Sequence, residues 1–299
     1  MAPLLLGVPV LAQFTPPPST QPLDTGAGGT RATENNSFEI FFDAPEQLQE
    51  TPAGTTRSVA SPMRGQECQS AEAESDLPMI ALTPASSSYS VTDRPSFAVF
   101  MPVMDADYAS LEIYTEDLSD VIVQLDIKLP KTTGILHIQL PEAIASTAAL
   151  QSGHSYWWAF TPQCGGSFQY LTVTPAWTQG EPSNPYPSAG ITRVTEDSEA
   201  ANPPENLDSL NLAIWYAERG VWFDTVDLLI QAMTDTSATA DLDRAQRLWS
   251  QLIEPQLTEL QAEYGLEPSL DLRPIADAPI IPIPPDDITI IFPLTLQTP

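Results

Sequence analysis

The chain has 299 residues, 42% of them hydrophobic, which is enough for one large domain or two small ones with a real core. Eleven basic residues stand against 39 acidic ones, so the formal net charge is −28. Nucleic acids and anionic lipids attract Lys and Arg, so this charge opposes sequence-independent binding to either, and we expect no nucleic-acid partner. We interpret the charge as a source of solubility, with capture of cations or of a basic partner as the alternative.

The first residues, MAPLLLGVPVLA, resemble the apolar region of a secretory signal. They end in Val-Leu-Ala ahead of a polar, proline-rich stretch, which predicts a signal-like segment at residues 1–12 with cleavage after Ala12, although no positive region precedes it. The run is too short to span a bilayer, and nowhere else do about 18 uninterrupted apolar residues occur. We therefore expect a secreted, periplasmic or cell-envelope protein whose mature chain does not insert into the membrane.

Residues 13–76 are rich in Pro, Gly, Ser, Thr and Glu, a composition typical of a linker. One apolar patch, SFEIFFDAP at residues 37–45, interrupts it. We interpret the patch as part of the linker, and two alternatives stay open, an edge strand and a docking segment.

Residues 77–193 carry the two-residue period of β-strands, in short runs bounded by turn residues. In GILHIQLP, for example, the alternation puts His137 on the face opposite to Leu136 and Ile138. Six or seven such strands predict an immunoglobulin-like antiparallel β-sandwich. The predicted strands lie at residues 96–102, 109–117, 121–130, 134–141, 154–166 and 168–177.

The stretch HSYWWAFTPQCGG, residues 154–166, holds a histidine and a cysteine ten residues apart. We expect Pro162 to break the strand ladder between them, so nothing in the spacing brings His154 to Cys164. Cys68 is the other cysteine of the chain, and an exported protein with two cysteines most simply joins them. The sequence therefore predicts a disulfide between Cys68 and Cys164.

Residues 208–265 show helical periodicity. The first helix is predicted from an N-cap at Asp208 to a C-cap at Gly220, and a second helix follows at once. A third helix starts near Asp241 and is expected to be interrupted at Pro255, with a further short helix as an option. The first two helices resemble one tetratricopeptide-like hairpin. No second copy of this hairpin follows, so we expect these helices to pack on the sandwich.

The remaining segments are a connector at residues 194–207 and a proline-rich tail at residues 266–299. We expect a disordered or loosely docked tail, and the alternative is that ITIIF, residues 288–292, adds a strand to a neighbouring protein. The predicted fold class is thus α+β, a sandwich followed by a small helical hairpin or three-helix region, with disordered proline-rich termini.

The sequence offers little support for catalysis. His137 and His154 lie on separate predicted strands without a Cys, His or carboxylate cluster at ligand spacing, and we interpret both as surface or strand-end residues. The acidic pairs at residues 105–107, 116–120 and 286–287 fall in predicted turns, where carboxylates are ordinarily solvated. Calcium bound by MDADYASLE, residues 104–112, is an alternative, although this stretch lacks the glycine of an EF-hand loop. We expect no catalytic residue, cofactor or metal.

Five stretches together resemble the mostly cyanobacterial family known as domain of unknown function 928. They are RPSFAVFMP, GILHIQLP, SGHSYWWAFTPQC, AIWYAERGVWFDTVDLL and RLWSQLI, and the likeness covers about residues 55–257. Family members carry an Arg-Gly-rich stretch ahead of their first cysteine, and the loosely similar TTRSVASPMRGQEC places Cys68 at that position, with most of the glycines missing. The resemblance implies an exported, uncharacterised protein and supplies no catalytic residues.

These observations predict a protein that acts by non-catalytic binding to another envelope or extracellular protein. The first alternative is a carbohydrate-binding module, in which Trp157 or Trp177 stacks on sugar rings, and inward-facing tryptophans would contradict it. A hydrolase is the third possibility, and it requires a pocket with converging carboxylates. The sequence does not define the partner or the oligomeric state.

Overall fold

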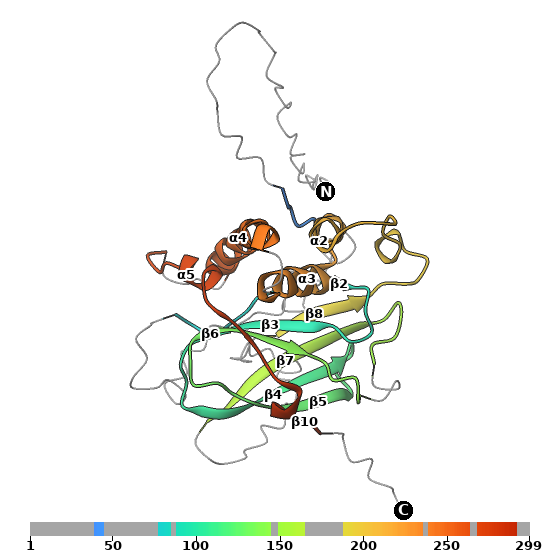
Figure 1. Cartoon of the computed structure of the whole chain (residues 1–299). Coiled ribbons are helices and arrows are strands. Elements are labelled where there is room, and N and C mark those ends of the chain that lie inside the picture. Colours follow the sequence, from blue (N-terminus) through green and yellow to red (C-terminus); the bar gives the residue numbers. More distant parts are fainter. Residues whose placement is uncertain are drawn as a thin grey trace, which may run out of the picture. The chain divides into compact units, whose positions relative to one another are not determined.

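The structure is a computed structural model of the chain, and it describes residues 39–44, 77–84, 88–144, 149–164, 188–235, 239–263 and 268–291. Contacts divide the chain after Ser37, and every described residue belongs to the second unit, Phe38–Pro299. This unit is α+β, with two mixed β-sheets and a group of helices (Figure 1).

The first sheet has four strands in the order β1-β3-β6-β9. Its strands are β1 (Ile80–Ala81), β3 (Ser96–Met101), β6 (Gly134–Gln139) and β9 (Ile280–Pro282). β3 runs antiparallel to β1 and β6, whereas β9 runs parallel to β6.

The second sheet has six strands in the order β10-β5-β4-β7-β8-β2. Its strands are β2 (Ser88–Ser90), β4 (Ala106–Thr115), β5 (Val121–Lys128), β7 (Ser155–Cys164), β8 (Ser188–Arg193) and β10 (Ile288–Ile291). β2 pairs with β8 in parallel, and the other neighbours are antiparallel. The prediction of purely antiparallel sheets is therefore wrong for one strand pair in each sheet. The strands predicted between residues 96 and 164 are present, and the one at 168–177 lies outside the described residues.

The two sheets contact each other through apolar side chains that alternate along their strands. The ring of Phe97 on β3 lies 4.7 Å from that of Trp158 on β7. Leu111, Leu125 and Phe160 of the second sheet are fully buried in the same core. These three residues lie on the inner face of the second sheet, as the two-residue alternation of a strand requires.

Pro162 does not end its strand, contrary to the prediction. β7 continues to Cys164, and Pro162 pairs with Ala109 of β4. β8 pairs with β7 only from Ser155 to Ala159, so no described strand requires a hydrogen from residue 162 on that side. A proline is tolerated at such a position because its missing N–H leaves no partner unsatisfied.

Among the described residues, four α-helices lie between β8 and β9: α2 (Ser209–Ala217), α3 (Trp222–Thr234), α4 (Thr239–Glu263) and α5 (Arg273–Ala276). The connector and the tail also contain the short 3₁₀ helices Glu199–Ala201 and Pro285–Asp287. α3 packs on β2 and β3 and also contacts α2 and α4. The expectation that the helices pack on the sheets is thus confirmed for α3.

The N-cap of α2 is the predicted one, whereas the helix ends at Ala217 with its C-cap at Glu218, and the predicted Gly220 closes the turn that follows. The Asp208 side chain accepts a hydrogen bond from the backbone N–H of Asn211 at 2.8 Å, as an N-cap does. At the other end Gly220 has φ 69°, and the backbone N–H groups of Gly220 and Val221 donate to the carbonyls of Ala217 and Tyr216. This pair of bonds is a Schellman motif, in which the left-handed residue is usually glycine.

Helix α4 passes through Pro255 without interruption, so the predicted break there is wrong. The proline removes one backbone hydrogen bond and disfavours a helix. Burial of Leu252 and Ile253 before it and of Leu257 and Leu260 after it keeps both halves of α4 in the core. Tertiary packing therefore outweighs the local cost.

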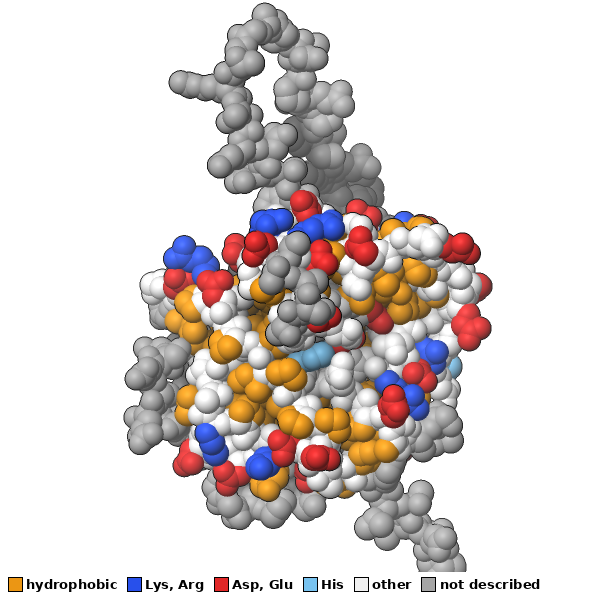
Figure 2. All heavy atoms as spheres, in the orientation of Figure 1, with side chains coloured by type: hydrophobic (Ala, Val, Ile, Leu, Met, Phe, Trp, Pro, Cys, Tyr) orange, Lys and Arg blue, Asp and Glu red, His pale blue; other side chains and the backbone are white. Residues whose placement is uncertain are grey.

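The tail contains two strands, so the predicted disorder is wrong for its described part. After α5 the chain adds β9 to β6 of the first sheet and then β10 to β5 of the second. ITIIF thus supplies a strand to the chain's own sheet through Ile288–Ile291. We call residues 279–291 the C-terminal strap. The strap runs from α5 to β10 in Figure 1, and Figure 2 shows hydrophobic side chains over the same part of the molecule.

Candidate functional site

A short extended segment, residues 39–44, lies against the helices although it precedes them by well over 150 positions in the sequence. We call it the docking segment. The side chains and carbonyl that receive it come from α2, α3 and α4, and we call them the helical docking surface: Ala217, Trp222, Arg244 and Gln251. The docking alternative for the apolar patch is therefore the one that the structure supports.

Apolar side chains anchor the docking segment on one side only. Ile40 is 2% exposed and belongs to the main core, and the ring of Phe42 stands edge-on to Trp222 with 5.0 Å between ring centres. Phe41, between them, is 71% exposed. This is the two-residue alternation of an extended chain with one face on a surface.

Polar groups fix the backbone of the docking segment. The Oε1 atom of Gln251 accepts hydrogen bonds from the backbone N–H of Glu39 at 2.9 Å and of Ile40 at 3.4 Å. At the other end the backbone N–H of Asp43 donates to the carbonyl of Ala217 at 3.1 Å. Bonds to the main chain hold an extended peptide whatever its side chains are, whereas pockets for alternate side chains provide selectivity.

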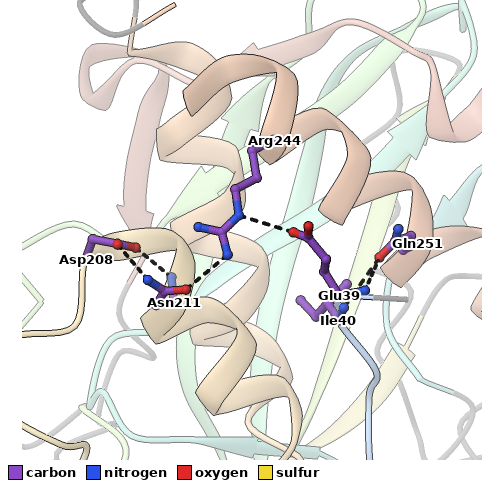
Figure 3. A network of polar contacts seen from close by, with 6 residues as sticks. All are labelled: Glu39, Ile40, Asp208, Asn211, Arg244 and Gln251. Atoms are coloured by element: carbon purple, nitrogen blue, oxygen red, sulfur yellow. Dashed lines mark hydrogen bonds and ion pairs between the residues drawn. The ribbon is translucent and has the colours of Figure 1, made fainter. Parts of the chain in front are cut away.

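Arg244 adds charge recognition, and α2 holds it in place (Figure 3). Its Nε donates to Oε2 of Glu39 at 3.2 Å, and its Nη2 donates to Oδ1 of Asn211 at 3.0 Å. Asn211 is itself bonded through its side-chain nitrogen to Asp208, at 2.6 Å. The N-cap of α2 therefore also orients the guanidinium that faces Glu39.

Beyond Gln251 the exposed side of α4 borders an open hollow of about 730 Å³. Its lining includes Asp243, Arg247, Ser250 and Glu254 besides Gln251. Of these side chains, Gln251 is the one that bonds the docking segment, so we treat the hollow as a neighbour of the helical docking surface and not as part of it.

A second polar cluster joins α3 to the first sheet. The Nε2 atom of His137 lies 2.9 Å from Oδ1 of Asp227, and Gln231 donates to the other oxygen at 2.7 Å. Burial raises the pKa of Asp227, but the hydrogen bond and charge of His137 outweigh it, and the pKa is lowered overall. His137 is 6% exposed and lies inside β6, where Asp227 of α3 contacts it, so its prediction as a surface or strand-end residue is wrong.

Asp224 of α3 occupies a more enclosed place against β2. Its Oδ2 atom accepts from the Ser90 hydroxyl at 2.9 Å and from the backbone N–H of Val91 at 3.0 Å. Burial raises the pKa of Asp224 to about 6, although these bonds act in the opposite direction. Both carboxylates of α3 are thus used to attach the helix to the sheets.

The outer face of the second sheet is polar, and we call it the polar sheet face. It comprises Tyr108, Glu112, Tyr114, Gln124, Asp126, Trp157 and Gln163, which pair across β4, β5 and β7. Glu112 accepts hydrogen bonds from the Tyr114 hydroxyl and, at 3.2 Å, from Gln124. Burial raises the pKa of Asp126, which accepts from Gln163 at 3.4 Å.

The structure describes two of the four sequence-predicted site residues, Trp157 and Cys164, and both lie on β7. Trp157 is half-buried on the polar sheet face, and its Nε1 donates to the carbonyl of Glu116 at 3.0 Å. Cys164 ends β7, whereas Cys68 and Trp177 lie outside the described residues, so the disulfide stays a prediction. The acidic residues of the pairs named above are mostly exposed, and Lys131 binds one of them, Asp107, at 2.7 Å.

Two further observations concern metals and membranes. Within the ranges that the structure describes, no three His, Cys, Asp or Glu side chains gather closely enough to hold a metal ion. None of the helices in those ranges combines the length and apolar character needed to cross a membrane.

Sequence reasoning did not single out Arg244, Gln251 or Asn211. These residues occupy ordinary polar positions of the amphipathic helices α4 and α2. The sequence feature that could have indicated a docking surface was the isolated apolar patch around Ile40. The receptor side of such a contact has no local pattern, because its residues meet only in the folded chain.

Comparison with known proteins gives one positive result. No curated protein and no solved structure matches this chain. The sequence profile described as Domain of Unknown Function (DUF928) matches residues 53–264, which include strands β1 to β8 and helices α2, α3 and α4. The chain therefore belongs to the DUF928 family.

Proposed function

We propose that this protein acts by non-catalytic binding to another protein of the cell envelope or extracellular space, through the helical docking surface. The observation that carries the proposal is the docking segment itself. Three helices hold an extended hexapeptide by its backbone, by two apolar anchors and by one ion pair. This combination is how proteins recognise extended peptides.

An extended protein segment suits this surface better than other ligand classes. Gln251 reads two successive backbone N–H groups, which are spaced as in a peptide. The core position of Ile40 and the ring of Trp222 take alternate side chains, with an exposed residue between them. Polyanions are disfavoured because the chain carries a net charge of −28.

The proposed location and scaffold rest on separate observations. The signal-like residues 1–12 and the predicted Cys68–Cys164 disulfide favour an exported protein. The order β1-β3-β6 in one sheet and β5-β4-β7-β8 in the other corresponds to the A-B-E and C′-C-F-G sheets of an immunoglobulin-like sandwich, which supports that fold. Such sandwiches are frequent in extracellular binding proteins.

Affinity capture with matched variants tests the proposal. The mature protein, the double variant Arg244→Glu/Gln251→Leu and the control Arg247→Glu are used as baits for envelope and medium fractions. Arg247 lies on the same helix, is exposed, and is not among the side chains that bond the docking segment. We expect a stoichiometric protein partner with the wild type and the control, and its loss with the double variant. A partner retained equally by all three would contradict the proposed surface.

The polar sheet face supports a second candidate, carbohydrate binding. Trp157 does not face the core, and Tyr108 is 48% exposed beside the amide and carboxylate of Gln163 and Asp126. Aromatic rings with neighbouring polar groups are the usual combination in sugar-binding sites. We expect this function only if polysaccharide retention falls with Trp157→Ala and stays unchanged with Trp215→Ala, which removes a half-buried tryptophan from α2 instead.

A further inference from the structure

The helical docking surface is occupied by the chain's own docking segment. Ile40 fills the apolar position, Phe42 covers Trp222, and Glu39 takes Arg244. Any partner that uses the same atoms must first remove these residues. The docking segment therefore shows what kind of peptide the surface binds, and it also blocks the surface against a partner.

The contacts of the docking segment are partly solvated. Of its side chains only Ile40 is fully buried, and Phe41 is 71% exposed. The ion pair between Glu39 and Arg244 has side chains that are 46% and 31% exposed, so water weakens it. A segment held in this way can leave the surface without opening the rest of the core.

We infer that residues 39–44 are a built-in competitor, and that the partner displaces them with an extended segment of the same chemical order. This order is an acidic residue, an aliphatic residue, any residue and an aromatic residue, as in Glu39-Ile40-Phe41-Phe42. Arg244 selects the first residue and Trp222 the last, while Gln251 bonds the main chain. The inference rests on the proposed function and specifies its partner and its regulation.

Covalent connection determines how strongly the competitor acts. The docking segment joins the first sheet through residues 45–76, so its docking is intramolecular. Intramolecular binding has an effective concentration that reaches the millimolar range. When the occupied form is at least about nine tenths of the molecules, the apparent Kd of an added segment is raised at least about tenfold.

Peptide binding to full-length variants tests the inference. The probe is a fluorescent peptide with the sequence of residues 37–45, and its anisotropy is measured with four proteins. They are the wild type, Ile40→Asp, Glu39→Lys and Phe41→Asp. Ile40→Asp removes the buried anchor, Glu39→Lys repels Arg244 without altering the core, and Phe41→Asp alters the exposed neighbour. Circular dichroism confirms that each variant is folded.

We expect Ile40→Asp and Glu39→Lys to bind the peptide at least about tenfold more tightly than the wild type. Phe41→Asp adds the same charge as Ile40→Asp at a side chain that is 71% exposed, so it should behave as the wild type. Equal affinity for all four folded proteins, or no binding to the two released variants, would overturn the inference.

A charge exchange separates recognition by Arg244 from a general loosening of the fold. A peptide in which Lys replaces the acid of residue 39 should bind Arg244→Glu, whose own Glu39 is repelled from the surface. It should bind the double variant Glu39→Lys/Arg244→Glu at least about tenfold more weakly, because the restored ion pair closes the site again. Equal binding to both variants would exclude competition at this position.

The two proposals can fail separately. If the partner still depends on Arg244 and Gln251 while the peptide binds no variant, the docking surface keeps its function and the inferred peptide chemistry is wrong. If the peptide binds the released variants while the partner ignores both residues, the surface binds only the chain's own segment, and both proposals are overturned.

Discussion

Asp224 is the residue at which burial and ionisation oppose each other most clearly. Its pKa is raised from 3.8 to about 6 because the contact of α3 with β2 removes the carboxylate from water. The unfolded chain therefore releases this proton at lower pH than the folded chain does. Between these two pKa values the folded state binds more protons, so its stability falls as pH rises.

We expect the free energy of unfolding to show this loss between pH 5 and 7. The contribution of Asp224 over that interval is about 1 kcal/mol, since one pKa unit corresponds to about 1.4 kcal/mol. Urea unfolding of the wild type and of Asp224→Asn at both pH values measures it. The side chain at position 224 of the variant cannot ionise. The free energy of unfolding of the wild type minus that of the variant should therefore be smaller at pH 7 than at pH 5. A difference that is independent of pH would contradict the argument.

At the same scale, the sequence indicates which residues are apolar but not which polar residues are enclosed. His137 alternates with the apolar residues of β6, yet the strand is buried on both faces, and on the face of His137 its neighbour is Asp227 of α3. Its partner Asp227 lies 90 positions further along the chain. Nothing local to either residue indicates the other, so the pair could not be predicted.

Among the elements, the strands and α2 follow local rules and were predictable. The side chain of Asp208 and the backbone N–H of Gly220 each form a hydrogen bond to a residue three positions away. Pro255 and the tail depend on distant contacts instead. The buried leucines of α4 keep the helix continuous through the proline. The isoleucine-containing strands of the C-terminal strap pair with the edges of β6 and β5.

The C-terminal strap also explains the glycine that begins β6. A Cβ atom on Gly134 would lie 2.5 Å from Cδ1 of Ile281 and 2.6 Å from the carbonyl oxygen of Pro279. The second atom belongs to the backbone, which accepts a hydrogen bond from Ile135, so the strap cannot yield by rotating a side chain. Glycine at position 134 is therefore a condition for the pairing of β9 with β6.

We expect Gly134→Ala to destabilise the protein by about 1–3 kcal/mol, the usual cost of inserting a methyl group into a filled contact. Urea unfolding measures this cost. Adding Ile281→Ala removes the clash with Ile281 and leaves the one with Pro279, so the double variant should be more stable than the sum of the two single changes implies. Additive effects, or a cost below about 0.5 kcal/mol for Gly134→Ala, would show that the strap does not press on this position.

For the molecule as a whole, the predicted Cys68–Cys164 disulfide would connect the segment before β1 to the end of β7. Closing a loop of about 100 residues stabilises a fold by about 4.7 kcal/mol when strain is absent. We expect the mature protein to take up no alkylating reagent without reduction and two equivalents after it, as read by intact mass. Two reactive thiols in the native, unreduced protein would rule out the bond.

The net charge of the molecule bears on how a partner reaches the helical docking surface. A segment with the chemistry of residues 37–45 carries two acidic side chains and approaches a chain of charge −28, so repulsion at long range opposes the attraction of Arg244 at contact. Salt screens the distant charges first, because the Debye length falls from about 30 Å at 0.01 M to about 8 Å at 0.15 M. Association should therefore speed up with salt, the reverse of what an oppositely charged pair does.

Stopped-flow anisotropy with the Glu39→Lys variant measures this effect on an open surface. We expect the association rate constant of the peptide to rise several-fold between 0.01 and 0.15 M salt, and the dissociation rate constant to rise less, because contact with Arg244 is only partly screened. A peptide with Gln and Asn in place of its acids should lose most of the salt dependence. Association that slows as salt increases would mean that the local field at Arg244, and not the charge of the whole chain, governs the encounter.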